Sequence, residues 1–349
     1  DLVGNLAKTT TETGQANLVA TYEYDNMNRL TKLTNFVDKN NNGSIDTDEL
    51  VSKFGYTLDS QGRKVHADET FNVSGAEKTS KIDWTYDNAG RLIREVFDHY
   101  DDTLDQTQEW EYDLVGNRLS QKLDKGNDNI WEAFTTYEYD VNDRLLTEIF
   151  DDLTDTNKDR LTEYGYDHTQ QTYKSVSENG TKLNETTFEY DVQGRMAIVT
   201  IVTFDENGTA TRIERISYGY NTDGIRVSAL HEIDADADGD FETSKLTEYL
   251  NDSLNITGYS QVIKQTETDL QTGDQANITY IIGRNRIAQI TVKDNTEQEL
   301  YFTFDGHGST RVLTDLAGAI LELYNFDAYG NAIDFAPSVA LTEFLYSGE

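Results

Sequence analysis

The sequence predicts an all-β protein built from repeated antiparallel β-hairpins. The main observation is a pattern of two aromatic residues, separated by one residue and followed by aspartate, that recurs roughly every 27 residues. A short turn with glycine or arginine follows each aspartate, and a second apolar run follows the turn. Helix signals are nearly absent, apart from short ambiguous stretches at 46–53 and 314–322.

One unit illustrates the expected hairpin. Tyr137 and Tyr139 are two residues apart, so in a strand both side chains point to the same face of the sheet. Asp140 can hydrogen-bond to its own backbone in a turn, and the run from Arg144 to Ile149 is typical of a returning strand. Because a lone hairpin is marginally stable, the units are expected to pair edge to edge in a longer sheet.

Nine copies of this unit span most of the chain. Their aspartates, or the asparagine in the last copy, are Asp1, Asp25, Asp59, Asp87, Asp113, Asp140, Asp167, Asp191 and Asn221. We expect the paired aromatic residues to lie on the inward face of the sheet and the turn arginines to pin neighbouring repeats. A sugar-binding aromatic platform is the less favoured interpretation of the same pairs.

Composition excludes several classes of protein. The chain has no cysteine, so neither disulfides nor thiolate metal sites are possible. Its formal net charge of −35 disfavours sequence-neutral binding to nucleic acid, because phosphate is repelled. No apolar run is long enough to span a membrane, and no signal peptide opens the chain.

The repeat resembles the YD repeat of the rearrangement hot-spot (Rhs) family, to which teneurins and toxin-complex shell proteins are related. The C-terminal region adds to the resemblance through segments that are similar to the core signature of Rhs proteins, at 255–262, 301–311, 324–331 and 344–349. The resemblance implies two regions, a YD-repeat β-sheet array over 1–244 and a truncated Rhs core region over 245–349. It also implies a solenoid-like spiral sheet that forms part of a shell.

The resemblance further implies a function without catalysis. The chain would be a structural segment of a longer, secreted or cell-surface bacterial protein, whose shell encloses a C-terminal, toxin-like polypeptide. Self-cleavage, known in the family at an Asp-Pro junction, is not carried over, because Pro337 follows alanine. The expected partners are the rest of its own longer chain and the enclosed polypeptide.

The first candidate metal site is the segment 38–49, which matches the calcium loop of EF-hand proteins. Its candidate ligands are Asp38, Asn40, Asn42, Ser44, Asp46 and Glu49. Calcium takes roughly six to eight oxygen ligands, which alternate residues of a tight loop can direct to one point. Gly43 permits the sharp turn, and Glu49 can bind through both oxygens. The alternative is a solvated polar turn.

The second candidate site is the segment 234–242. It repeats the first nine positions of the same loop, with Asp234, Asp236, Asp238, Asp240 and Glu242 as candidate ligands of Ca²⁺. Lysine at the twelfth position argues against a helix–loop–helix and for a loop that joins two strands. Without a cation, these carboxylates would repel one another.

Weaker acidic groups occupy the same place in other repeats, and solvated turns are the preferred interpretation for them. They are Asp98, Asp102 and Asp105; Asp124 and Asp128; and Asp151, Asp155 and Asp159.

Three classes of function remain. The core signature favours an encapsulating shell, and the alternative is a cell-surface adhesin or carbohydrate-binding stalk that recognises surface glycans. A hydrolytic enzyme is disfavoured, because the histidines are scattered and no nucleophile or cofactor motif is present. For His307, within the core signature, a structural hydrogen bond is preferred over catalysis.

Overall fold

The computed structural model describes residues 1–46, 48–255 and 258–348. It is all-β, as predicted, and most of the chain forms one sheet of 24 strands. Each strand pairs antiparallel with the next strand along the chain, so the sheet is an uninterrupted series of hairpins. Two residues of the proposed core signature, Ile256 and Thr257, and the terminal Glu349 lie outside the described residues.

The first half of the sheet comprises β1 (Lys8–Glu12), β2 (Asn17–Tyr24), β3 (Leu30–Asp38), β4 (Leu50–Leu58), β5 (Lys64–Val73), β6 (Ala76–Tyr86), β7 (Leu92–Asp98), β8 (Gln106–Tyr112), β9 (Arg118–Lys125), β10 (Ala133–Tyr139), β11 (Leu145–Asp152) and β12 (Arg160–Tyr166). The second half comprises β13 (Gln171–Glu178), β14 (Thr181–Tyr190), β15 (Met196–Phe204), β16 (Ala210–Tyr220), β17 (Arg226–Asp234), β18 (Thr243–Asp252), β19 (Gln261–Asp269), β20 (Gln275–Ile282), β21 (Arg286–Lys293), β22 (Thr296–Phe304), β23 (Thr310–Thr314) and β24 (Ile320–Leu323).

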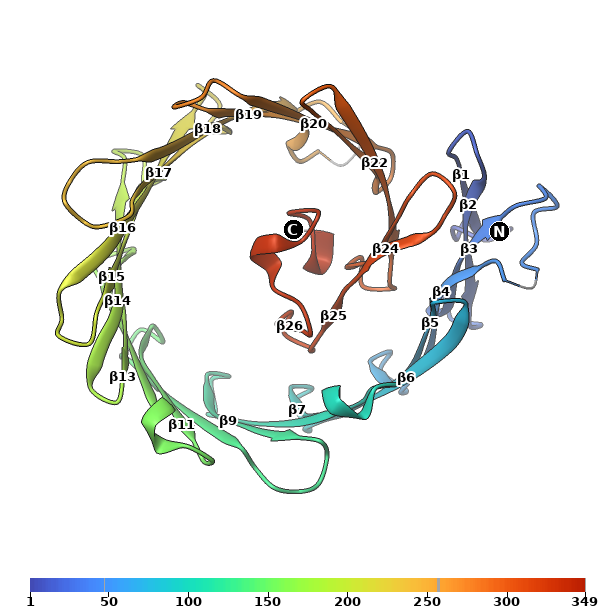
Figure 1. The fold of residues 1–349 in the computed structure, drawn as a ribbon. Helices are drawn as coiled ribbons and strands as arrows, with labels where there is room; N and C mark the ends of the chain where they lie inside the picture. Colours follow the sequence, from blue (N-terminus) through green and yellow to red (C-terminus); the bar gives the residue numbers. More distant parts are fainter. Residues whose placement is uncertain (47, 256–257, 349) are drawn as a thin grey trace.

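The sheet curls into a ring, and its two ends meet where β22–β24 pass β1–β5 (Figure 1). The ends are held by packing of side chains: Leu33 and Phe54 near the start of the sheet share one buried cluster with Ala288, Tyr301 and Val312 near its end. Among the described residues, β1 and β24 are not paired with each other. The ring therefore closes by overlap of two layers of sheet, which buries the main hydrophobic core at the seam.

The repeated turns form one rim of the ring, and the unit around Asp140 shows how each is built. Asp140 Oδ1 accepts hydrogen bonds from the backbone N–H groups of Asn142 and Arg144, and its Oδ2 accepts one from Arg144 Nε at 2.7 Å. Asp143 has φ +61°, the left-handed conformation that glycine takes in several other copies. The aspartate thus folds the turn and orients the arginine.

The same unit is fastened to both neighbours. The Tyr139 hydroxyl donates to the carbonyl of Arg118 in the preceding repeat at 2.9 Å. Arg144 donates to the carbonyl of Asp167 in the following repeat at 3.0 Å and lies over the Tyr166 ring. The equivalent tyrosines Tyr24, Tyr86, Tyr112, Tyr166, Tyr190 and Tyr220 make the same backbone contact. The expectation that turn arginines pin neighbouring repeats is confirmed.

After β24 the chain turns into the interior of the ring (Figure 1). This C-terminal segment, residues 325–348, contains β25 (Asn325–Phe326), β26 (Ala332–Ile333) and the short 3-10 turns η3 (Pro337–Val339) and η4 (Tyr346–Gly348). It packs on the inner wall at both sides through edge-to-face ring contacts: Tyr329 contacts Trp110 of β8, and Phe344 contacts Tyr280 of β20. In this part of the ring the motif aromatics face inward, as expected.

Several details differ from the sequence expectations or refine them. The ambiguous stretches 46–53 and 314–322 contain no described helix, and their regular parts belong to β4, β23 and β24. Two further 3-10 turns, η1 (Asp102–Leu104) and η2 (Thr156–Lys158), lie in acidic loops. In the described part of the chain, no helix has the length and apolar character needed to cross a membrane. The sheet continues through residue 245 within β18, and the division there stays a prediction.

Candidate functional site

The loops opposite the repeated turns form a second, acidic rim. In the first candidate calcium loop, between β3 and β4, Asp38 is buried and accepts backbone hydrogen bonds from Asn42 and Gly43. Glu49 is also buried and accepts from the N–H groups of Lys39 and Asp46, which closes the loop.

The remaining proposed ligands of this loop lie at its exposed end. The side-chain amides of Asn40 and Asn42 both donate to Asp46 Oδ2 at 2.7 Å, so these three residues are brought together. Ser44 contributes only a backbone N–H, donated to Asn42 Oδ1. The loop therefore brings Asn40, Asn42 and Asp46 together at its exposed end. Among the described residues, its acidic side chains do not form a carboxylate cluster like those of the other loops.

The second candidate loop, between β17 and β18, gathers its carboxylates more closely. Asp234, Asp236, Asp238 and Glu242 each place one oxygen within 4.8 Å of the others. Asp240 lies outside that group. Asp234 is fully buried and accepts from the N–H groups of Asp238 and Gly239, while Glu242 accepts from that of Ala235. This is the hydrogen-bond pattern of the first loop, closed by Glu242 in place of Glu49.

A third loop, between β9 and β10, has the same arrangement and was expected to be only a solvated turn. Asp124, Asp128 and Glu132 place carboxylate oxygens within 4.8 Å of one another. Asp124 is buried and accepts from the N–H groups of Asp128 and Asn129, and Glu132 accepts from that of Lys125. Acidic residues stand at its first, fifth and ninth positions, as they do in 234–242, and this spacing could have identified the loop from the sequence.

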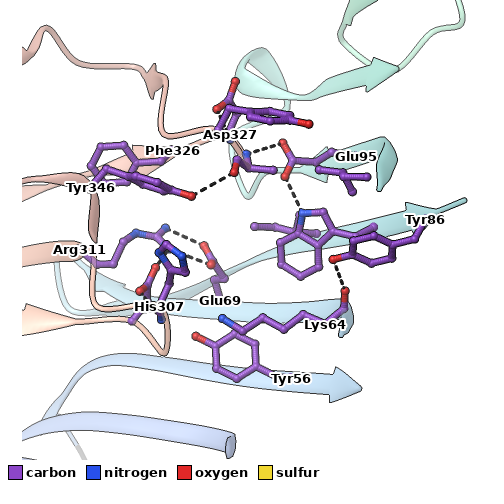
Figure 2. Close-up of a pocket in the computed structure, with 16 residues that line it drawn as sticks. Tyr56, Lys64, Glu69, Tyr86, Glu95, His307, Arg311, Phe326, Asp327 and Tyr346 are labelled. Carbon is purple, nitrogen blue, oxygen red and sulfur yellow. Dashed lines mark hydrogen bonds and ion pairs between the residues drawn. The ribbon is translucent and has the colours of Figure 1, made fainter. Parts of the chain in front are cut away.

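A cavity of about 310 Å³ lies between β4–β7 and the C-terminal segment. Figure 2 shows Glu69, Glu95, Lys64 and Arg311 around it, among the rings of Tyr56, Tyr86, Phe326 and Tyr346. Glu95 accepts a hydrogen bond from Trp84 Nε1 at 2.6 Å and one from the N–H of Ala328. Burial raises the pKa of the Glu95 carboxyl to about 7, and the negative charge of Asp327 adds to that rise.

The charges beside this cavity are used in holding the structure together. Arg311 forms a buried, two-pronged ion pair with Glu69. Burial lowers the pKa of Lys64, whose ammonium group lies 4.1 Å from the centre of the Tyr56 ring. His307 Nδ1 lies 3.0 Å from the Ser347 hydroxyl, and its ring contacts Tyr346, which agrees with a structural role.

No protein-family model matches this chain, and no curated protein does. Solved structures match in part. The crystal structure of TcdB2-TccC3 aligns with 100% of this chain and 25% of its own, at 12% identity and a TM-score of 0.38. The crystal structure of TcdB2-TccC3 without the hypervariable C-terminal region aligns with 95% of this chain and 24% of its own, at 11% identity and a TM-score of 0.40.

A third match is a structure of the Photorhabdus luminescens Tc holotoxin pore, which aligns with 91% of this chain and 18% of its own. Its identity is 15% and its TM-score 0.35. The chain thus spans a quarter or less of the length of each of these proteins.

Proposed function

We propose that this chain is a non-catalytic structural segment of a larger YD-repeat shell, whose curved sheet encloses polypeptide. The observation that carries the proposal is the position of residues 325–348, which lie inside the ring formed by the chain's own sheet (Figure 1). The repeat-to-repeat hydrogen bonds explain how such a wall can be extended, since each unit fastens to the next through the same groups.

The inner wall already binds polypeptide in this structure. Gln108 donates to Asp327, the Tyr112 and Tyr329 hydroxyls are hydrogen-bonded to each other, and Gln289 donates to the Leu341 carbonyl. Two of these contacts join side chains, and that of Gln289 satisfies a backbone carbonyl of the enclosed segment. The inward direction of the aromatics in this region favours the shell over the alternative, an adhesin that would present them to surface glycans.

The test compares two extensions of the chain. A flexible linker with a protease site is added after residue 349 in one protein and before residue 1 in the other. Because the C-terminal segment lies inside the ring and the N-terminal strands lie in its wall, the C-terminal site should be cut more slowly at equal protease concentration. Equal cutting rates in two folded proteins would contradict the proposal.

We also propose that calcium stabilises this segment through the loops 38–49 and 234–242, and through 124–132. The support is the shared geometry of a buried first aspartate, which accepts backbone hydrogen bonds within the loop, and a closing glutamate. Such oxygen-rich loops suit calcium. Extracellular modules often bind calcium at roughly 10⁻⁴–10⁻³ M. We therefore place the protein in a secreted or cell-surface setting, where calcium of that concentration is present.

A further inference from the structure

A second cavity, of about 570 Å³, lies at the seam where the two ends of the sheet overlap. One wall comes from β1–β3 and includes Tyr22 and Leu33. The opposite wall comes from the β20–β21 turn, the start of β21 and β22, and includes Arg284, Arg286 and Phe302. The cavity thus combines apolar side chains and threonines with two arginines.

Arg286 is a cation with no acidic partner among the described residues. Among the described residues it forms no ion pair, its Nε is buried without a hydrogen-bond partner, and its one hydrogen bond is a long contact of 3.5 Å to the Gly348 carbonyl. Its guanidinium packs on the Phe344 and Tyr280 rings, 3.1 Å and 5.1 Å from their centres. Burial lowers the pKa of Arg286 to about 10, as expected for a guanidinium that no carboxylate compensates.

This arrangement is unlike that of the turn arginines. Arg29, Arg63, Arg91, Arg144 and Arg195 each pair with the aspartate of their own repeat. Carboxylates are plentiful in a chain with a formal net charge of −35, yet none of the described ones pairs with this half-buried arginine. Buried charges are costly unless a partner of opposite sign is present, so Arg286 is suited to receive one.

Arg284 adds a second positive charge at the same cavity. Arg284 and Tyr22 both line this cavity, from its two opposite walls. Burial raises the pKa of the Tyr22 hydroxyl. In the described part of the chain Arg284 forms no ion pair either. The carboxylate that lines this cavity, Asp305, accepts from the N–H groups of His307 and Ser309 and lies 3.4 Å from Arg311.

We propose that the seam cavity binds an organic anion, a carboxylate on an apolar body, with Arg284 and Arg286 as the residues that hold the carboxylate. The planar guanidinium presents paired donors that match the two oxygens of a carboxylate. The apolar body would lie against Leu33, Phe302 and Phe304. Because the cavity is walled by both ends of the sheet, the ligand would also hold the seam closed.

Isothermal titration calorimetry with hexanoate, 1-hexanol and inorganic phosphate tests the proposal. Hexanoate should bind, and the other two should bind at least tenfold more weakly, because one lacks the charge and the other the apolar body. Equal binding of hexanol would show an apolar cavity only, and equal binding of phosphate would show a general anion site. Either result, or no binding of hexanoate, would overturn the proposal.

Two variants and one control assign the residues. Arg284→Gln changes an exposed side chain and should weaken hexanoate binding about tenfold without affecting folding. Arg286→Gln should abolish binding, with the fold checked by circular dichroism. Arg226→Gln is the matched control, since the Arg226 guanidinium also packs on two rings, those of Tyr218 and Tyr249, but Arg226 does not line the cavity. Unchanged binding in Arg284→Gln, or an equal loss in Arg226→Gln, would contradict the assignment.

Discussion

Arg311 and Glu69, which are 242 residues apart in the sequence, form a two-pronged ion pair with N–O distances of 2.8 Å and 2.7 Å. Each side chain is only 5% exposed. Arg311 also donates to the Tyr324 carbonyl and to Asn325 Oδ1, so its donors are shared between the wall and the C-terminal segment. This pair joins β5 to β23 and lies where the ring closes.

Removing only one partner of this ion pair should destabilise the fold strongly. Glu69→Gln leaves the Arg311 charge buried without compensation, which costs about 3–5 kcal/mol in comparable buried pairs. The measurement is the free energy of unfolding in urea. Glu178→Gln is the control, because it breaks a pair with Arg160 in which the side chains are 32% and 50% exposed, and should cost less than about 1 kcal/mol.

A double variant separates the pair from the surrounding packing. Glu69→Leu combined with Arg311→Met removes both charges and should recover much of the loss, since a buried ion pair is often replaceable by apolar residues. If Glu69→Gln and Glu178→Gln prove equally mild, the seam does not depend on this pair.

The link between repeats predicts a smaller effect at Tyr139. The ring is half-buried, and Tyr139→Phe removes only the hydrogen bond to the Arg118 carbonyl. The expected loss is about 1 kcal/mol in the free energy of unfolding. Tyr173→Phe serves for comparison, because its hydroxyl contacts Glu185 at 3.4 Å, the long end of hydrogen-bond distances. If Tyr173→Phe lowers the free energy of unfolding as much as Tyr139→Phe does, the hydrogen bond between repeats is not what stabilises the chain at Tyr139.

The raised pKa of Glu95 predicts a specific pH dependence of the free energy of unfolding. Its pKa is about 7 in the folded chain, against 4.5 for an unperturbed glutamate, so the folded state holds a proton that the unfolded state has lost between these values. Stability from this group is therefore greatest below about pH 4.5 and falls as pH rises to about 7, by up to about 3 kcal/mol.

Glu95→Gln should remove that contribution and leave the other titrating groups in place. The difference in unfolding free energy between the variant and the natural sequence should grow in favour of the variant from pH 5 to pH 8. Parallel stability curves over this range would show that Glu95 is not buried against Asp327 and Ala328 as described.

Calcium should raise the thermal midpoint, and a chelator should reverse the effect. A cation that binds only the folded chain adds about 2.7 kcal/mol at a hundredfold excess over its Kd. Asp236→Ala combined with Asp238→Ala should remove the response of the loop 234–242, and Asp124→Asn that of the loop 124–132. Asp205→Asn, in a plain hairpin turn, is the control. A midpoint that chelation leaves unchanged would refute the calcium proposal.

The hairpins were predictable because their determinants are local. Tyr139, Asp140 and Arg144 fix the strand, the turn and the link to the next repeat within a few residues. The seam was not predictable, because Glu69 and Arg311 are distant in sequence, and the signature segment 301–311 that ends at Arg311 does not indicate its partner. The third acidic loop was missed because Gly126 occupies the position where the other two loops have a side-chain ligand.

The most direct test of an enclosed C-terminal segment is a cross-link between Tyr112 on the wall and Tyr329 in the segment, whose hydroxyls are hydrogen-bonded. Photo-oxidative coupling of tyrosines, followed by digestion and mass spectrometry at low protein concentration, would identify the product. The enclosed position of the segment predicts an intramolecular dityrosine that joins peptides containing residues 112 and 329 and is absent in Tyr329→Phe. Failure to form this link in the folded natural sequence, while other adjacent tyrosines couple, would contradict it.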